Sequence, residues 1–205
     1  MAQTPAYAPV YHRADVTMVR GAGVHLYDEA GKAYLDFSSG IAVNALGHGH
    51  PHVVNALKTQ ADQLWHCSNN YKNEPLLRFA KRLVGQSLLD SVFFCSSGSE
   101  AVETGIKFIR RYHHMRGTPA KQRIITFQNG FHGRSLACIS AGGNTVAREG
   151  FAPLLEGFDA VAFNDLGAVD SAINGQTALA DAAIVTDSRK IIRSKFYLSI
   201  ANGHH

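Results

Sequence analysis

The sequence contains few of the residues that mark specialised protein classes. It has three cysteines (Cys67, Cys95 and Cys138), six prolines and one tryptophan among 205 residues. An odd number of widely spaced cysteines argues against a disulfide framework. The 19 glycines follow no period, which excludes a collagen-like chain. No apolar run approaches the roughly 20 residues that a membrane-spanning helix needs.

Two further features bear on location and partners. The first residues lack a basic segment followed by an apolar stretch, so no secretory signal is expected and the protein is predicted to be cytoplasmic, without a membrane partner. The formal net charge is +4, but the lysines and arginines are scattered and form no block of like charge. Nucleic acid is therefore not an expected partner, whereas a mildly basic surface suits an anionic small molecule.

Strand and helix patterns alternate along the chain after residues 1–20, which are expected to form a loosely structured arm. The expected strands are a hairpin of residues 24–27 and 33–37, an apolar run at 91–95, and residues 123–127 and 160–163. Helices are expected at 51–65 and 74–84, from the 96–100 segment to about 116, and from about 166 to 173. The second of these helices is expected to bury Leu76, Leu77, Ala80 and Leu83. This alternation predicts an α/β fold with a mostly parallel sheet.

The segment Ser-Ser-Gly-Ser-Glu at residues 96–100 joins the apolar run to a long amphipathic helix. The free N–H groups and the positive dipole end of a helix bind phosphate, and the hydroxyls of Ser97 and Ser99 add donors. The alternative is a capping box, with Ser97 or Ser99 as N-cap and Glu100 or Glu103 reaching back. Neither a Walker P-loop nor a dinucleotide-binding glycine pattern is present.

The loop at residues 128–135 follows an expected strand and carries Phe131, His132 and Arg134. Ligands of α/β proteins bind at the carboxyl ends of strands. Phe131 could stack on a planar cofactor, and Arg134 could hold a carboxylate through two hydrogen bonds. The alternative is a loop histidine that is satisfied locally and a solvent-exposed arginine.

Three alternating histidines, His48, His50 and His52, have the appearance of metal ligands. No nearby cysteine or acidic pair completes a zinc site, so no metal is expected. A glycine-rich turn that leads into the next helix is the preferred interpretation.

The motifs together are similar to those of the class III pyridoxal-phosphate aminotransferases, within them the acetylornithine, succinylornithine and ornithine group. The likeness extends from about residue 19 to residue 178 and keeps the motif order of the family. It is carried by YLDFSSGIAVN at 34–44, LGHGHPHV at 46–53, FFCSSGSEAVETGIKFIRRY at 93–112 and ITFQNGFHGRSLACISAGG at 125–143.

The resemblance implies the first part of a fold-type I transferase, pyridoxal 5'-phosphate as cofactor, and roles for particular residues. The implied cofactor-binding residues are Ser97, Gly98, Ser99, Phe131 and His132. Arg134 matches the arginine that binds the substrate α-carboxylate, while Glu100 and Glu103 match positions at the start of the phosphate-binding helix. Residues 40–49 match a segment near the dimer interface, so a homodimer is implied.

The chain departs from the family after residue 178. The expected Glu-Pro, Asp-Glu-Val-Gln and Schiff-base lysine motifs do not appear in residues 179–205. The eight lysines, none in the catalytic context of the family, are Lys32, Lys58, Lys72, Lys81, Lys107, Lys121, Lys190 and Lys195. We therefore expect a truncated aminotransferase with no catalytic residue. Its expected divisions are a small-domain part (1–65), the first part of the large domain (66–178) and an unrelated tail (179–205).

The resemblance implies amino transfer from acetylornithine, succinylornithine or ornithine to 2-oxoglutarate, with an amino acid and a 2-oxo acid as small-molecule partners. Because the lysine is missing, this chain is expected not to turn over alone. The alternative function is a non-catalytic fragment that binds pyridoxal phosphate or phosphate, or that dimerises.

Overall fold

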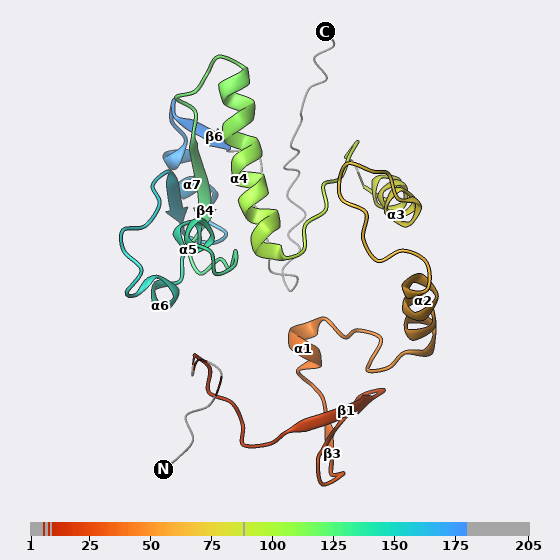
Figure 1. Cartoon of the computed structure of the whole chain (residues 1–205). Coiled ribbons are helices and arrows are strands. Elements are labelled where there is room, and N and C mark those ends of the chain that lie inside the picture. The colour runs from red at the N-terminus through yellow and green to blue at the C-terminus, as the bar shows by residue number, and fades with distance from the viewer. Residues whose placement is uncertain (1–5, 7, 9, 88, 180–205) are drawn as a thin grey trace. The chain divides into compact units, whose positions relative to one another are not determined.

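The computed structural model (Figure 1) describes residues 6, 8, 10–87 and 89–179. The chain divides into two compact units, Met1–Ser87 and Leu88–His205. Within the described ranges, no helix is long and apolar enough to span a membrane. Residues 180–205, which make up nearly all of the expected tail, lie outside the described residues.

The first unit contains a three-stranded antiparallel sheet in the order β1-β2-β3. The strands are β1 (Met18–Ala22), β2 (His25–Asp28) and β3 (Ala33–Leu35). The predicted hairpin is confirmed as the β2–β3 pair, and its turn includes Gly31 at a φ of 79°. The assignment of residues 1–20 to an arm is wrong at its end, because Met18–Ala22 pairs with β2. A local pattern could not show this pairing, which depends on the neighbouring strand.

The glycine-rich segment after β3 contains one left-handed turn, α1 (Ser39–Ala42). Ser39, Ile41 and Ala42 have φ values of 48°, 66° and 62°. Left-handed backbone at residues other than glycine costs roughly 1–2 kcal/mol each. The turn therefore needs support from neighbouring groups.

Asp36 supplies part of that support. Its carboxylate accepts hydrogen bonds from the backbone N–H of Ser38 and of Ser39, and it lies 2.7 Å from the His48 Nε2. The hydrogen bonds with His48, with the Ser38 hydroxyl and with the Ser39 N–H, in that order of effect, lower the pKa of Asp36 to about 2. His48 is therefore the partner of a carboxylate in this turn.

Two helices complete the first unit, α2 (Pro51–Ala61) and α3 (Glu74–Val84). The bounds of α3 are those predicted, and the Asn73 side chain caps it by accepting from the Leu76 N–H at 2.9 Å. α2 ends four residues earlier than predicted, where the Trp65 Nε1 donates to the Ala61 carbonyl at 2.6 Å. That hydrogen bond folds the indole back over the last turn and satisfies one terminal carbonyl.

The predicted burial of the α3 apolar face is wrong. Leu76 and Leu77 are 41% and 44% exposed, Leu83 lies at the limit of exposure, and α3 has no buried residue. An amphipathic pattern shows that a face can be buried, but another element has to cover it. Among the described residues of this unit, no helix or strand covers Leu76 and Leu77.

The second unit contains a three-stranded parallel sheet in the order β5-β4-β6 (Figure 1). The strands are β4 (Arg123–Phe127), β5 (Phe158–Val161) and β6 (Thr177–Leu179). The parallel arrangement and the bounds of β4 are confirmed. β5 begins two residues earlier than predicted, because the register places Phe158 opposite Ile124.

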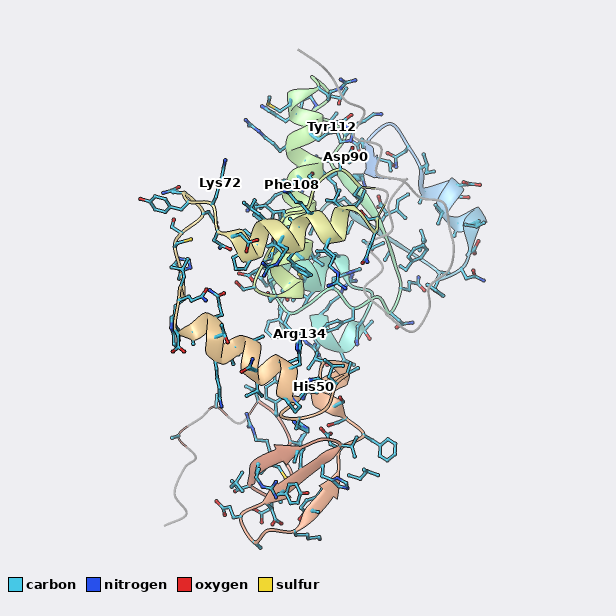
Figure 2. All side chains as sticks on the ribbon, turned by 90° about the vertical axis from the view of Figure 1, so that its right-hand side faces the viewer. His50, Lys72, Asp90, Phe108, Tyr112 and Arg134 are labelled. Atoms are coloured by element: carbon cyan, nitrogen blue, oxygen red, sulfur yellow. The ribbon has the colours of Figure 1, made fainter. Side chains whose placement is uncertain are left out.

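The predicted strand at residues 91–95 is wrong. The structure assigns this run to no strand. A strand needs a neighbour for its N–H and C=O groups, and hydrophobicity alone does not supply one. Phe93 instead packs edge to face on Phe108 of the following helix, with ring centroids 5.7 Å apart (Figure 2 labels Phe108).

Four helices accompany the sheet: α4 (Gly98–Met115), α5 (Leu136–Ala141), α6 (Thr145–Arg148) and α7 (Leu166–Ala172). Two of these helices, α4 and α7, were predicted from the sequence, and both end within a residue of the expected positions. A buried cluster joins α4, α5 and β4, and consists of Val102, Ile106, Ile124, Ala137 and Cys138. Ile124 and Cys138 are each 1% exposed. This core fixes the start of α4 and the start of α5 against the central strand.

Candidate functional site

The start of α4 combines a cap with two available donors. Ser97 is the N-cap: its hydroxyl accepts from the Glu100 N–H at 3.2 Å and donates to the Glu100 carboxylate at 3.0 Å. The capping alternative is therefore confirmed for Ser97. Within the described part of the chain, the N–H groups of Gly98 and Ser99 have no acceptor, and a Cβ on Gly98 would meet nothing within 4 Å. Both N–H groups belong to the first turn of an 18-residue helix, where the positive end of the helix dipole lies.

The loop that follows β4 meets this helix start. The Arg134 N–H donates to the Ser99 hydroxyl at 3.4 Å. Gly133 has a φ of 125°, and a Cβ at this position would overlap the Ser99 hydroxyl. The two segments singled out in the sequence are thus brought together, and glycine is required where they touch.

Two predicted site residues project from this loop into solvent. Phe131 is 59% exposed, and the Arg134 side chain, labelled in Figure 2, is also exposed. The Arg134 guanidinium lies over the Phe131 ring at 5.4 Å from its centroid. The cation thus lies over one face of the aromatic ring; an aromatic ring suits a planar group, and a guanidinium suits an anion.

Ser135 and Glu103 form a contact that sequence reasoning missed. The Ser135 hydroxyl donates to the Glu103 carboxylate at 2.6 Å and caps α5 by accepting from the Cys138 N–H at 3.4 Å. The sequence suggested Glu103 as a capping partner for its own helix and as a match to the start of the phosphate-binding helix, but not as a partner of Ser135. The two residues are 32 positions apart, so no local signal could have found the contact.

His132 points inward between these exposed neighbours. It is 7% exposed, and neither ring nitrogen has a hydrogen-bond partner in the described structure. Burial lowers its pKa below the ordinary value. The His132 side chain is therefore buried under its own loop. Its assignment to cofactor binding remains a prediction.

The comparisons with known proteins identify the family. The model of "Aminotransferase class-III" matches residues 6–190. This chain belongs to the class III aminotransferases. Among its curated relatives, an acetylornithine aminotransferase of Agrobacterium fabrum is 51% identical over 176 residues, which cover 84% of this chain and 44% of that protein. A succinylornithine transaminase of Yersinia enterocolitica is 48% identical over 84% of this chain and 42% of that protein.

Solved structures of aminotransferases share the fold of this class III chain. The ornithine aminotransferase of Toxoplasma gondii matches with a TM-score of 0.75 and 26% identity, over 81% of this chain and 40% of that one. An amine transaminase of an uncultivated Pseudomonas species, solved in its PLP-bound form, matches with a TM-score of 0.70 and 29% identity, over 78% and 39%. The α/β fold is thus part of a fold-type I domain. The chain spans less than half the length of the curated relatives given above.

Acid is expected to destabilise the second unit of this aminotransferase chain through His132. Because its pKa is lowered in the folded unit, the unfolded chain binds a proton more readily below pH about 6.5. The free energy of unfolding therefore decreases as pH falls from that value toward the lowered pKa. Hydrogen exchange at the Ile124 and Ile125 amides, measured at pH 7.5 and 5.5, checks this.

The control is His132→Leu, which cannot titrate. The change in the free energy of unfolding between pH 7.5 and pH 5.5 should be smaller in this variant than in the parent chain. An equal difference in both would show that His132 does not contribute to the acid sensitivity.

Proposed function

We propose that this chain provides the pyridoxal-phosphate cradle of an acetylornithine-type aminotransferase. The observation that carries the proposal is the meeting of the α4 start with the loop after β4, at Ser99 and Arg134. In this proposal the N–H groups of Gly98 and Ser99 hold the cofactor phosphate, and Phe131 stacks on its ring. When bound, the cofactor supplies an electron sink for the substrate carbon.

The residues present fit such a group. A phosphate needs several N–H donors and a positive field, and the α4 start offers two N–H groups without acceptors among the described residues, ahead of a long helix. The Ser97 hydroxyl is already used by Glu100, so we assign the phosphate to the backbone donors rather than to that hydroxyl. His132 supports the loop from below in this scheme.

Removal of one N–H group tests the phosphate site. Gly98→Pro removes the donor at the first helical position, where proline is well tolerated, and the extended backbone of Ser97 suits a following proline. Loss of a hydrogen bond to a charged group should weaken pyridoxal phosphate binding by about tenfold or more. Cofactor fluorescence titration measures this affinity, with pyridoxal as a ligand that lacks the phosphate.

The matched control is Gly98→Ala, which keeps the N–H group and places its Cβ in open space. It should bind pyridoxal phosphate nearly as well as the parent chain. Equal binding by the proline variant would exclude the Gly98 N–H as a phosphate donor. No saturable binding by the parent chain would overturn the proposed function.

The names of the relatives support a substrate class for the proposed enzyme. We assign an N-acylated or free ornithine as amino donor, because relatives near 50% identity are named for acetylornithine and succinylornithine. The proposed acceptor, 2-oxoglutarate, follows from the resemblance to the family, and the proposed cytoplasmic location follows from the sequence. Arg134 is the proposed receptor for the α-carboxylate, since its guanidinium is exposed beside Phe131. Its planar fork matches a carboxylate.

We extend the proposal to a homodimer. Exposed apolar side chains gather on the segment after β3 in the first unit, with Phe37 at 90%, Ile41 at 92% and Val43 at 75% exposure. Apolar residues exposed together are typical of an interaction surface. A second copy of the chain is the proposed partner.

A second candidate function is supported by the lysine content of the chain. None of its eight lysines has the catalytic sequence context, which favours a non-catalytic fragment that binds the cofactor reversibly. Borohydride reduction separates the two candidates. A single lysine labelled in full supports catalysis, whereas saturable binding without a specific label supports the non-catalytic fragment.

A further inference from the structure

The backbone on both sides of Arg134 is tied to α4. On one side Gly133 lies against Ser99, whose hydroxyl accepts the Arg134 N–H. On the other side Ser135 donates to the Glu103 carboxylate at 2.6 Å. Both contacts are made by the first two turns of α4. Because the loop is held at two points, it cannot rotate about either one alone.

The contact between Ser135 and Glu103 is the stronger of the two ties. A hydroxyl that donates to a carboxylate forms a charge-assisted hydrogen bond, and 2.6 Å is typical of that class. The same hydroxyl oxygen accepts the Cys138 N–H at the start of α5. Both groups are partly buried, which reduces competition from water.

We propose that Glu103 is a positioning residue that sets the direction of Arg134 through Ser135. The inference rests on the proposed function of Arg134 as the receptor for a substrate carboxylate. The Arg134 side chain is exposed and lies on the Phe131 ring, so its direction depends on the backbone from which it starts. A receptor for a carboxylate must be held closely in place, because small displacements reduce binding.

Nuclear magnetic resonance of the full chain tests the positioning directly. The Phe131 ring shifts the signals of the Arg134 δ-protons as long as the guanidinium lies over it. Glu103→Leu removes the acceptor, whereas Glu103→Gln keeps a carbonyl oxygen in its place. Ser135→Ala removes the donor, and Arg111→Ala changes an exposed residue of the same helix.

The expected result is loss of most of this ring-current shift in Glu103→Leu and in Ser135→Ala. Glu103→Gln and Arg111→Ala should keep the ring-current shift. Each of these variants also removes a charge from α4, so a retained shift shows that loss of charge alone does not move Arg134. Hydrogen exchange at the Ile124 amide reports whether each variant is folded. An unchanged Arg134 signal in a folded Glu103→Leu variant overturns the inference. If Glu103→Leu does not fold, an unchanged Arg134 signal in Ser135→Ala overturns it.

A ligand measurement separates this inference from the proposed function. Titration with 2-oxoglutarate should show about tenfold weaker binding at Arg134 in Glu103→Leu than in the parent chain. Equal 2-oxoglutarate affinity in parent and variant overturns the inference. Absence of 2-oxoglutarate binding by the parent chain would count against Arg134 as a carboxylate receptor, and the ring-current shift then decides the positioning by itself.

Discussion

The purified chain, saturated with pyridoxal phosphate, is expected to give no catalytic transfer of an amino group from N-acetylornithine to 2-oxoglutarate. The reaction needs a lysine amine that bonds to the cofactor and a base that moves the proton of the substrate carbon. Two described lysines lie in the unit that holds the candidate site, Lys107 and Lys121.

The structure places both lysines far from the cradle. Lys107 is exposed on α4, nine residues beyond Gly98, which corresponds to about 13 Å along a helix. Lys121 lies before β4, at the opposite end of the strand from the loop of Phe131, about 16 Å away along an extended strand. Neither lysine therefore lies at the start of α4 or on the loop of Phe131, the two segments that form the proposed cradle.

Glutamate production measured by a coupled assay checks this expectation. The reaction of pyridoxal phosphate without protein provides the background, and the double variant Lys107→Arg with Lys121→Arg provides the matched control. Turnover above background that survives in the double variant would identify a lysine elsewhere. Turnover that disappears would show that one of the two lysines reaches the cofactor despite these distances.

Gly133→Ala is expected to disrupt the candidate site and to destabilise the second unit by about 3 kcal/mol or more. Two effects add. The φ of 125° is a conformation that residues with a side chain rarely adopt, and the new Cβ would overlap the Ser99 hydroxyl. The loop must move away from α4, which breaks the hydrogen bond from the Arg134 N–H.

Gly150→Ala separates the two effects. Gly150 also has a positive φ, 78°, but a Cβ there would meet nothing within 4 Å. Backbone strain alone should then cost about 1 kcal/mol. Chemical denaturation followed by hydrogen exchange at β4 amides measures both variants, and equal losses would show that the approach of Ser99 to Gly133 is not tight.

Several elements could be predicted from local sequence. α3 has an asparagine cap and a proline in its first turn, and β4 is a short β-branched and aromatic run, so their bounds follow from neighbouring residues. The hairpin of β2 and β3 has a glycine where the turn needs a positive φ. Each of these depends on contacts within a few positions along the chain.

Other elements depend on partners far along the chain, and there the predictions were wrong. Residues 91–95 have the composition of a buried strand, but the structure assigns them to no strand. β1 carries no clear pattern, yet it forms because β2 offers its edge. The apolar face of α3 marks a surface to be covered, and no sequence pattern says what covers it.

The sequence by itself determined the family, a helix start within residues 96–100 and the loop of Phe131 and Arg134, since each is a local motif; the structure decided that Ser97 rather than Ser99 is the N-cap. Tertiary structure alone decided that Ser99 receives the Arg134 N–H, that Glu103 receives the Ser135 hydroxyl, and that His132 turns inward. The reason is physical: these contacts join residues more than 30 positions apart, or depend on packing around them. They form only when the core of α4, α5 and β4 brings the helix start and the loop together.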